Sequence, residues 1–354
     1  MPIDRQQAFS GTTAADIDAG ALEAHLAGHI AGFAGPLSLA RFKGGQSNPT
    51  YKLSTPGASY VLRRKPFGKL LPSAHAIERE YRVTAALAEA GFPVALPLHL
   101  CTDESVIGAA FYVMEHAEGR VFWEPHAPGL SGEERAALFS SLNETIARLH
   151  GFDPAALGLL DFGKPQGYVA RQIRRWSEQY RASETETIPE MDRLIAWLPG
   201  VCPEDSGAAV VHGDFRLDNC IVHPTEPRVI AVLDWELSTI GDPLADFTYH
   251  LMQWFMPVSD TGAGVGSLLG HEQDAGVPPV EAYIAAYCRR TGRSGIPNLS
   301  VYMAYNFFRL AAILQGILGR VRDGTAANAE AAAMARQVRP LAETAWRFAT
   351  EAGA

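Results

Sequence analysis

Several features that assign proteins to specialised classes are missing from this sequence. Its four cysteines are scattered without a CxxC pair, so we expect reduced thiols, no disulfide framework and no cysteine-based zinc site. No uninterrupted apolar run reaches the ~18 residues that a membrane span needs. The formal net charge of -9 lacks the basic excess of a general nucleic-acid-binding protein. The N-terminal residues show neither the basic start nor the apolar stretch of a signal peptide. These absences predict a cytoplasmic protein that binds neither nucleic acid nor membrane.

The sequence does contain enough apolar material for a large core. With 354 residues, of which 47% are hydrophobic, it predicts two domains or one large bilobed domain. In the first third, short segments rich in β-forming residues lie between Gly and Pro residues, with one helical segment among them. The predicted strands lie within residues 37–45, 49–57, 58–66, 96–101 and 110–115, and the predicted helix covers residues 73–91.

The pattern changes after Gly119, where apolar residues recur at helical spacing. Ser131 and Glu134 have the spacing of a capping box at the start of the first long helix. The predicted helices cover residues 131–150, 168–183, 280–291 and 299–321. The sequence therefore predicts an α+β, bilobed fold, with an antiparallel five-stranded sheet lobe over residues 1–117 and a larger helical lobe over residues 118–354.

A helix predicted within residues 16–30 places His25 and His29 one helical turn apart. Two imidazoles at this spacing can bind a metal ion together. No third ligand is evident from the sequence, so we expect a solvent-exposed helix face rather than a metal site.

The most informative stretch is HGDFRLDN, which begins at His212 and places several polar side chains between apolar segments. Asp214 precedes Asn219 by five positions, and Asp234 ends the next apolar run. Phosphoryl transfer needs such groups, because a carboxylate must orient and deprotonate the attacking hydroxyl while an amide oxygen and a second carboxylate hold Mg2+ against the phosphates. The alternative is a tight turn in which Asp and Asn side chains cap local backbone groups. The four residues together at this spacing favour catalysis.

HGDFRLDN, together with LDWE and GDPLADF further along the chain, resembles the aminoglycoside phosphotransferase and choline kinase family, whose members are relatives of the protein kinases. The resemblance implies a protein-kinase-like fold with ATP and Mg2+ as cofactors. It implies that Asp214 is the catalytic base and that Asn219 and Asp234 bind Mg2+. It also implies that His212 braces the loop and that Asp246 helps to hold it.

The same resemblance assigns the segment KGGQSNPTY to the loop that covers the nucleotide phosphates. Gly44 and Gly45 would let backbone N–H groups approach phosphate oxygens, and Ser47 or Asn48 would add side-chain donors. A plain hairpin turn is the alternative. The segment FYVMEHAEGR matches the connection between the lobes of the family, where the backbone carbonyl and amide groups of Glu115 and Ala117 would bind adenine.

One position departs from the protein-kinase pattern. Protein kinases hold the phosphates with a Lys on the third strand, paired with a Glu on the next helix. Here Arg63 occupies the matching place and Glu80 is the expected partner. Arginine keeps the charge and binds carboxylate and phosphate in a forked geometry. Alternation with Val61 predicts an inward-facing Arg63, although Arg64 and Lys65 are adjacent candidates and a solvated basic strand end is the other interpretation.

These patterns predict a small-molecule kinase that phosphorylates a hydroxyl group. A nucleotide-binding pseudokinase used as a regulatory module is the alternative, but such proteins usually lose one of Asp214, Asn219 and Asp234. A protein kinase is disfavoured because the D-F-G and A-P-E signatures and an activation segment are missing.

The segments YVLRRKP and VLDWELSTIGDPLADF are most similar to a subgroup of the family that is associated with acyl-CoA dehydrogenases. This similarity implies a hydroxyacyl-CoA or related hydroxy acid as acceptor, and association with an acyl-CoA dehydrogenase as a partner. Arg174 and Arg175 on the helix predicted over residues 168–183 are candidate contacts for an anionic acceptor. A solvated basic face is the alternative for these arginines.

Overall fold

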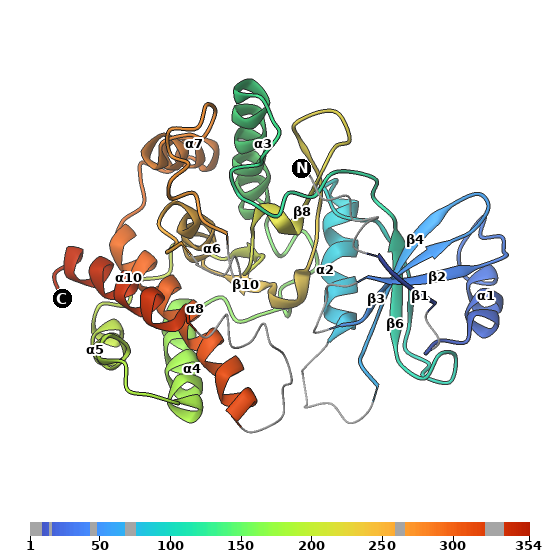
Figure 1. The fold of residues 1–354 in the computed structure, drawn as a ribbon, viewed down its shortest axis with the longest axis horizontal. Helices are drawn as coiled ribbons and strands as arrows, with labels where there is room; N and C mark the ends of the chain where they lie inside the picture. The colour runs from blue at the N-terminus through green and yellow to red at the C-terminus, as the bar shows by residue number, and fades with distance from the viewer. Residues whose placement is uncertain (1–8, 14–15, 43–47, 68–75, 259–265, 323–335) are drawn as a thin grey trace. The chain divides into compact units, whose positions relative to one another are not determined.

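The structure, a computed structural model, describes residues 9–13, 16–42, 48–67, 76–258, 266–322 and 336–354. The chain divides into two compact units, and each is discontinuous in sequence (Figure 1). Unit 1 consists of Met1–Phe122, Leu157–Leu159 and Asp218–Ser238, and unit 2 consists of Trp123–Ala156, Leu160–Leu217 and Thr239–Ala354. The domain boundary after residue 117 stays a prediction. The sequence pattern did not indicate that a segment a hundred residues further on groups with the N-terminal sheet.

An antiparallel sheet with the strand order β1-β2-β3-β4-β6-β5 forms the centre of unit 1. Its strands are β1 (Phe9–Thr13), β2 (Ser38–Phe42), β3 (Thr50–Ser54), β4 (Ser59–Arg64), β5 (Pro97–Cys101) and β6 (Phe111–Glu115). The five predicted strands are all present, and β1 adds a further strand at one edge.

The two faces of this sheet pack against different helices, because successive strand residues point to opposite sides. Phe111 of β6 shares a buried apolar cluster with Leu22 and Leu26 of α1 (Ala19–Ala27). The next residue, Tyr112, packs with Ile77 of α2 (Ile77–Glu89) on the other face. In Figure 1 the two helices accordingly flank the strands.

The segment Asp218–Ser238 joins unit 1 through backbone hydrogen bonds. It contains η3 (Leu217–Asn219, whose first residue belongs to unit 2), β8 (Cys220–Val222), β9 (Val229–Val232) and η4 (Trp235–Leu237), with β8 and β9 antiparallel. The N–H of Arg120 donates to Val222 over 2.7 Å and the N–H of Val222 donates back over 2.8 Å. A Cβ at Gly119 would lie 2.4 Å from the Val222 carbonyl oxygen, so this close approach requires glycine.

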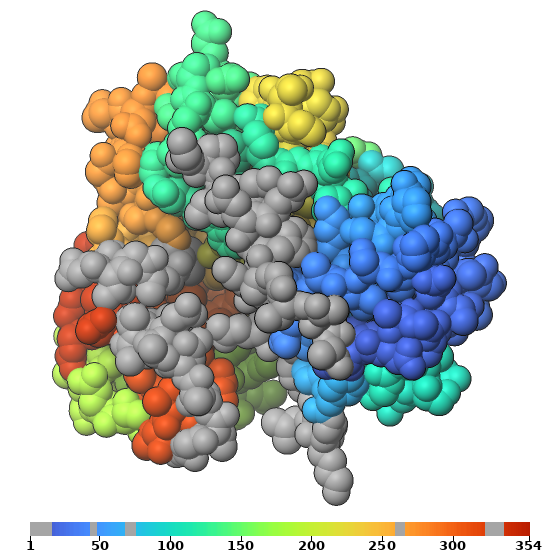
Figure 2. All heavy atoms as spheres, turned by 45° about the vertical axis from the view of Figure 1, so that its right-hand side comes forward, coloured from blue at the N-terminus to red at the C-terminus, as the bar shows by residue number. Residues whose placement is uncertain are grey.

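Unit 2 is mainly helical, with one two-stranded sheet in which β7 (Ala209–Val211) pairs antiparallel with β10 (Thr239–Gly241). The helices are α3 (Gly132–His150), α4 (Tyr168–Ser183), α5 (Pro189–Trp197), η2 (Leu198–Gly200), α6 (Pro243–Leu251), η5 (Met252–Trp254), α7 (Val280–Thr291), α8 (Leu299–Arg322) and α10 (Val338–Glu351). The predicted capping box of Ser131 and Glu134 is confirmed, with both reciprocal hydrogen bonds present. Helix α8 packs against α4 and α10, and Figure 2 shows the yellow-green residues of α4 and α5 beside the red residues near the C-terminus.

Helix α8 is long and apolar enough to cross a membrane by length and composition alone, with a mean hydropathy of 1.3 over its most apolar window. However, 83% of that window is buried within the protein. The helix also buries the polar side chains of Asn306, Arg309 and Gln315. Such burial is typical of the core helix of a globular fold, because polar groups on it find partners inside the protein.

Candidate active site

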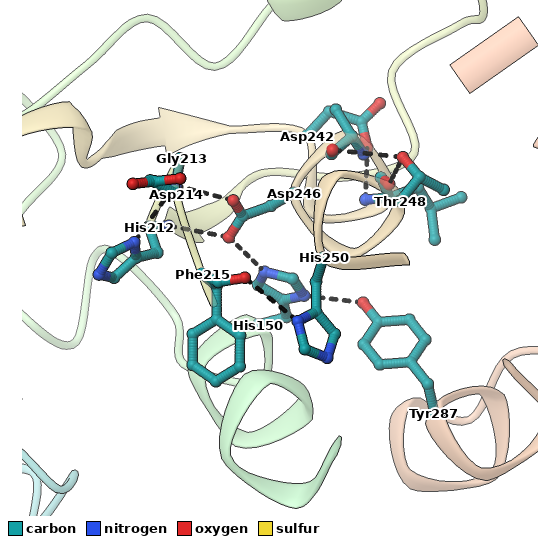
Figure 3. Close-up of polar contacts among 12 residues, drawn as sticks. His150, His212, Gly213, Asp214, Phe215, Asp242, Asp246, Thr248, His250 and Tyr287 are labelled. Carbon is teal, nitrogen blue, oxygen red and sulfur yellow. Dashed lines mark hydrogen bonds and ion pairs between the residues drawn. The ribbon is translucent and has the colours of Figure 1, made fainter. Parts of the chain in front are cut away.

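The loop that carries Asp214 begins where β7 ends and is anchored by a buried carboxylate from α6. Oδ2 of Asp246 accepts the N–H of His212 over 2.8 Å, and Oδ1 accepts the N–H of Gly213 over 2.7 Å (Figure 3). Gly213 has a φ of 83°, in the left-handed region that glycine adopts without a Cβ clash. The loop therefore turns directly after the strand, and its two first amides are fixed on one side chain.

Asp246 keeps its charge although it is only 4% exposed. Burial acts to raise the pKa of this carboxyl group, but the hydrogen bond and charge of His150 and the amide of His212 outweigh burial and lower the pKa. Nε2 of His150 lies 3.1 Å from Oδ2 of Asp246, and Nδ1 lies 2.8 Å from the hydroxyl of Tyr287. Because an ionised carboxylate only accepts, Nε2 of His150 carries the proton in its contact with Asp246.

The carboxylate of Asp214 is held by two side chains and remains partly exposed. The hydroxyl of Tyr249 donates to Oδ1 over 2.7 Å, and Nε of Arg216 donates to the same oxygen over 2.9 Å. The backbone N–H of Asp214 donates to Nδ1 of His212 over 3.2 Å, which is the geometry that bracing of the loop by this imidazole requires. The arrangement presents an oriented carboxylate to solvent, as a general base must.

Sequence reasoning missed Tyr249 and Arg309, which complete the support of this loop. Nη2 of Arg309, on α8, donates to the carbonyl of Gly213 over 2.8 Å, and its guanidinium lies 5.0 Å from the centre of the Tyr249 ring. Arg309 is 6% exposed. Two signals were available: a lone arginine in an apolar helical stretch, and a tyrosine three residues after Asp246, on the same helix face.

In unit 1, Arg63 of β4 joins three carboxylates. Its Nε lies 3.0 Å from Oε2 of Glu80, and its Nη2 lies 2.8 Å from Oδ1 of Asp234 and 3.4 Å from Oε2 of Glu236. The Nε–H makes no directed hydrogen bond, so its contact with Glu80 is a close ion pair. Burial acts to lower the pKa of Arg63, but the charges of Glu80 and Asp234 outweigh burial and raise it, so the guanidinium stays charged.

The two basic neighbours of Arg63 pair with other carboxylates. Arg64 donates to Asp16 over 2.7 Å, and Nζ of Lys65 lies 2.5 Å from Oε1 of Glu78. Of the three, Arg63 is the partner of Glu80.

Glu80 is 2% exposed and is held by two further donors. Nδ2 of Asn48 donates to Oε1 over 2.9 Å, and the hydroxyl of Tyr112 donates to Oε2 over 3.2 Å. Burial raises the pKa of Glu80 to about 7, although the charge of Arg63 opposes the shift. Asn48, predicted as a phosphate donor, thus supports the Arg63–Glu80 pair in this structure, and its phosphate contact stays a prediction.

Asp234 and Asn219 lie at the same end of the β8–β9 hairpin. The N–H of Leu233 donates to the carbonyl of Asn219 over 2.8 Å. Asn219 directly precedes β8 and Asp234 follows β9, so the two predicted Mg2+ ligands lie next to paired strand ends. Asp234 has φ 65° and ψ 59°, a left-handed conformation that is costly for a residue with a Cβ. Its side chain is 38% exposed. A carboxylate and an amide oxygen with room for water fit the hard-oxygen coordination of Mg2+.

Five further residues were predicted for the phosphate loop and the adenine contact. Gly44, Gly45 and Ser47 lie outside the described residues. At the end of β6, the N–H of Glu115 donates to Leu96 over 2.9 Å, and Ala117 packs against the apolar cluster of Val121, Ile221 and Ala231. Their adenine contacts stay a prediction.

Two arginines of α4 were predicted to contact an anionic acceptor. Both Arg174 and Arg175 are exposed, and the guanidinium of Arg175 lies 5.1 Å from the centre of the Trp176 ring. Nearby Arg181 pairs with Glu184 over 2.8 Å and with Asp192 over 2.5 Å. The role of Arg174 and Arg175 in acceptor binding stays a prediction.

Comparisons with known proteins identify the family of this chain. Residues 38–302 match the model of the phosphotransferase enzyme family. A crystal structure from Ralstonia eutropha JMP134, provisionally described as an aminoglycoside phosphotransferase, is 50% identical, with a TM-score of 0.85 over 95% of this chain and 99% of that chain. A thermostable mutant of the aminoglycoside phosphotransferase APH(4)-Ia, solved as a ternary complex with ADP and hygromycin B, shares the fold at 16% identity, with a TM-score of 0.57 over 88% of this chain and 94% of that one.

The chain also matches longer curated proteins. Acyl-CoA dehydrogenase family member 10 of Mus musculus is 46% identical over 94% of this chain, which covers 31% of that protein. The chain spans less than half the length of the curated relatives it matches. The family match and the near-complete likeness to the Ralstonia structure establish the assignment: this chain belongs to the phosphotransferase enzyme family and has its protein-kinase-like fold.

Proposed function

We propose that this chain transfers the γ-phosphoryl group of ATP to a hydroxyl group of a small-molecule acceptor. The observation that carries the proposal is the carboxylate of Asp214, which Tyr249 and Arg216 orient on a loop anchored by Asp246. ADP in the distantly related APH(4)-Ia structure supports a nucleotide as the donor through the shared fold.

In the proposed reaction Asp214 accepts the proton of the acceptor hydroxyl. The hydroxyl oxygen forms a bond to the γ-phosphorus while the bond from that phosphorus to the β,γ-bridging oxygen breaks, and ADP leaves. Asn219 and Asp234 would hold Mg2+, which neutralises negative charge on the phosphates. Arg63, fixed by Glu80, would hold phosphate oxygens.

The proposed acceptor is anionic, in the class of hydroxyacyl-CoA esters and related hydroxy acids. Support comes from the acyl-CoA dehydrogenase names of the long relatives, one of which contains a matching segment in 31% of its length. The exposed Arg174 and Arg175 provide positive charge that such an acceptor needs. Association with an acyl-CoA dehydrogenase is part of the same proposal. A pseudokinase is the second candidate, but the three groups Asp214, Asn219 and Asp234 are all retained.

The first experiment replaces the base. Asp214→Asn removes the proton acceptor while keeping the shape of the side chain, so turnover should fall by roughly two to four decades. Affinity for magnesium–nucleotide should stay within a few-fold of wild type. A phosphate-release screen over hydroxyl compounds identifies the acceptor for the assay. Near-wild-type turnover in the variant would contradict the role of Asp214, and nucleotide binding without turnover of any acceptor would favour the pseudokinase.

A second experiment tests acceptor charge. Arg174→Glu/Arg175→Glu should weaken binding of a hydroxyacyl-CoA, and the loss should be larger at low ionic strength, where charges are less screened. Arg336→Glu/Arg347→Glu is the matched control, because it makes the same change of charge at exposed arginines near and on α10. Equal losses in both variants, or phosphorylation of polycationic aminoglycosides with none of any hydroxyacyl-CoA, would refute an anionic acceptor.

A further inference from the structure

Three histidines of unit 1 that have no part in the proposed phosphoryl transfer lie close together. His25 lies in the last turn of α1, His29 follows that helix, and His99 lies on β5. One ring nitrogen from each lies within 4.8 Å of the corresponding atoms of the other two. The sequence indicated no third ligand and so predicted a solvent-exposed helix face. The structure does bring a third imidazole to this pair, from a strand about seventy residues further on.

The imidazole nitrogens of two members face each other directly. Nε2 of His25 lies 2.9 Å from Nε2 of His99. Two nitrogens bound to one tetrahedral Zn2+ lie ~3.3 Å apart, given Zn–N bonds of ~2.0–2.1 Å. A separation of 2.9 Å thus needs only a small outward movement of the rings to admit an ion. Without an ion, one Nε2 must donate its proton to the other.

The third imidazole has a tautomer that leaves one ring nitrogen available for a ligand. Nδ1 of His29 lies 2.7 Å from the backbone carbonyl of His25. A carbonyl only accepts, so Nδ1 carries the proton and the lone pair of Nε2 is left for a ligand. Metal-binding histidines commonly donate their other ring N–H to a backbone carbonyl in this way, which fixes the tautomer and the ring direction.

Ring contacts hold the three imidazoles together. The His29 ring stacks on His25 with 4.1 Å between ring centres and an interplanar angle of 18°, and its centre lies 4.6 Å from that of His99. One of the two stacked rings must therefore turn for both lone pairs to point at one ion. The buried ring of Phe111 packs edge-on against both His25 and His99. Asp103 lies close enough to His25 to affect its pKa, which places a negative group near any bound cation.

We propose that His25, His29 and His99 form a binding site for one divalent first-row transition-metal ion of the Zn2+ class, which fastens the end of α1 to β5. Imidazole nitrogens suit Zn2+, Ni2+ and Cu2+, whereas Mg2+ prefers oxygen ligands and should not compete. Three protein ligands leave a coordination position for water. The site is separate from the Mg2+ ligands proposed for phosphoryl transfer and does not depend on that reaction.

Titration of the untagged full-length chain with Zn2+ in the presence of excess Mg2+ tests the proposal. Isothermal calorimetry should show one site, and Zn2+ should raise the thermal unfolding temperature, because an ion that binds only the folded state stabilises it. Co2+ added in place of Zn2+ should develop the visible absorption of a nitrogen-ligated ion. Both signals should be present with no nucleotide or acceptor in the sample.

Variants assign the site. His29→Ala removes an exposed ring, so the fold should be retained, and Zn2+ affinity should fall by about 10-fold to 100-fold or more. His99→Gln should do the same with a conservative shape. His223→Gln, on the β8–β9 loop, is the control and should bind as wild type does. Because His126 and His271 also stack, at 3.8 Å, His271→Ala is included. Unchanged affinity in His29→Ala, or loss confined to His271→Ala, would overturn the assignment, as would the failure of wild type to bind Zn2+ at all.

Discussion

The hydroxyl of Tyr249 donates to Oδ1 of Asp214 over 2.7 Å, and both residues belong to the helical unit (Figure 3 shows Asp214 in its loop). Tyr249 lies one helical turn beyond Asp246, the residue that anchors the loop backbone. Helix α6 therefore positions both the backbone of the loop and the carboxylate at its tip. Burial raises the pKa of Tyr249 far above its ordinary value, so the phenol keeps the proton that it donates.

Tyr249→Phe removes this donor and leaves the ring in place. A hydrogen bond to a charged group contributes ~1.5–3 kcal/mol, so we expect turnover to fall by about 10-fold to 100-fold. Affinity for the nucleotide should not change, because Tyr249 is not among the residues proposed to bind it. Steady-state kinetics with the acceptor from the screen gives both values. Tyr60→Phe, which removes a hydroxyl in the sheet unit, is the control. A raised KM for nucleotide with unchanged turnover would contradict the positioning role.

Two substitutions of Asp234 separate the cost of its left-handed backbone from its predicted role as a metal ligand. A non-glycine residue in the left-handed region costs ~1–2 kcal/mol, and Asp234 sits there with φ 65°. Asp234→Gly and Asp234→Ala both remove the carboxylate and the ion pair with Arg63, but only glycine relieves the strain. The lower entropy of unfolded alanine opposes this difference in part.

We therefore expect Asp234→Gly to be more stable than Asp234→Ala in urea unfolding, and both variants to lose Mg2+-dependent binding of ATP in calorimetry. A variant could instead bind ATP as tightly as wild type does with Mg2+, and with the same affinity when Mg2+ is left out. Asp234 would then not be a metal ligand. Equal stability of the two variants would show that the left-handed backbone at this position is not costly.

The parts of the fold that followed from sequence are those set by local pattern. Strand alternation and turn residues located the five strands, and the capping box located the start of α3. Arg63 and Glu80 were paired through the family pattern, and the structure shows them in contact. In each case the information lies within a few residues or within a known motif.

The missed features depend on packing between distant segments. Arg309 reaches Gly213 because α8 lies beside the loop, and no spacing rule relates two residues 96 positions apart. His99 meets His25 because β5 and α1 share one face of the sheet, which requires the strand order that places β5 beyond β6. Strand order is a tertiary property, so neither contact could be read from a single sequence.

Buried His250 is expected to make the helical unit less stable in acid. Burial lowers its pKa to about 4 from an ordinary value of 6.5. Between these values the unfolded chain binds a proton that the folded chain does not, so this group makes stability rise with pH from about 4 to 6.5. The full effect is on the order of 3 kcal/mol. In His250→Gln the dependence of unfolding free energy on pH over this window should be shallower than in wild type. An unchanged slope would show that His250 is not buried as a neutral ring.

Buried Glu80 is expected to make stability fall as pH rises, over a pH range that overlaps that of His250. Burial raises its pKa to about 7, whereas the unfolded value is near 4.5. Between these values the folded chain holds a proton that the unfolded chain has lost, so the contribution of Glu80 to stability is complete below about 4.5 and is lost as pH rises towards 7. Glu80→Gln keeps hydrogen-bonding atoms near Arg63 and Asn48 but cannot titrate. We expect the unfolding free energy of wild type, minus that of Glu80→Gln, to decrease from pH 5 to pH 7 and then to level off. The subtraction cancels His250 and the other titrating groups that both proteins share. A difference that instead grows with pH would mean that the ion pair with Arg63 outweighs burial and that Glu80 is stabilised as a carboxylate, in which case the pair would persist unchanged through the neutral range.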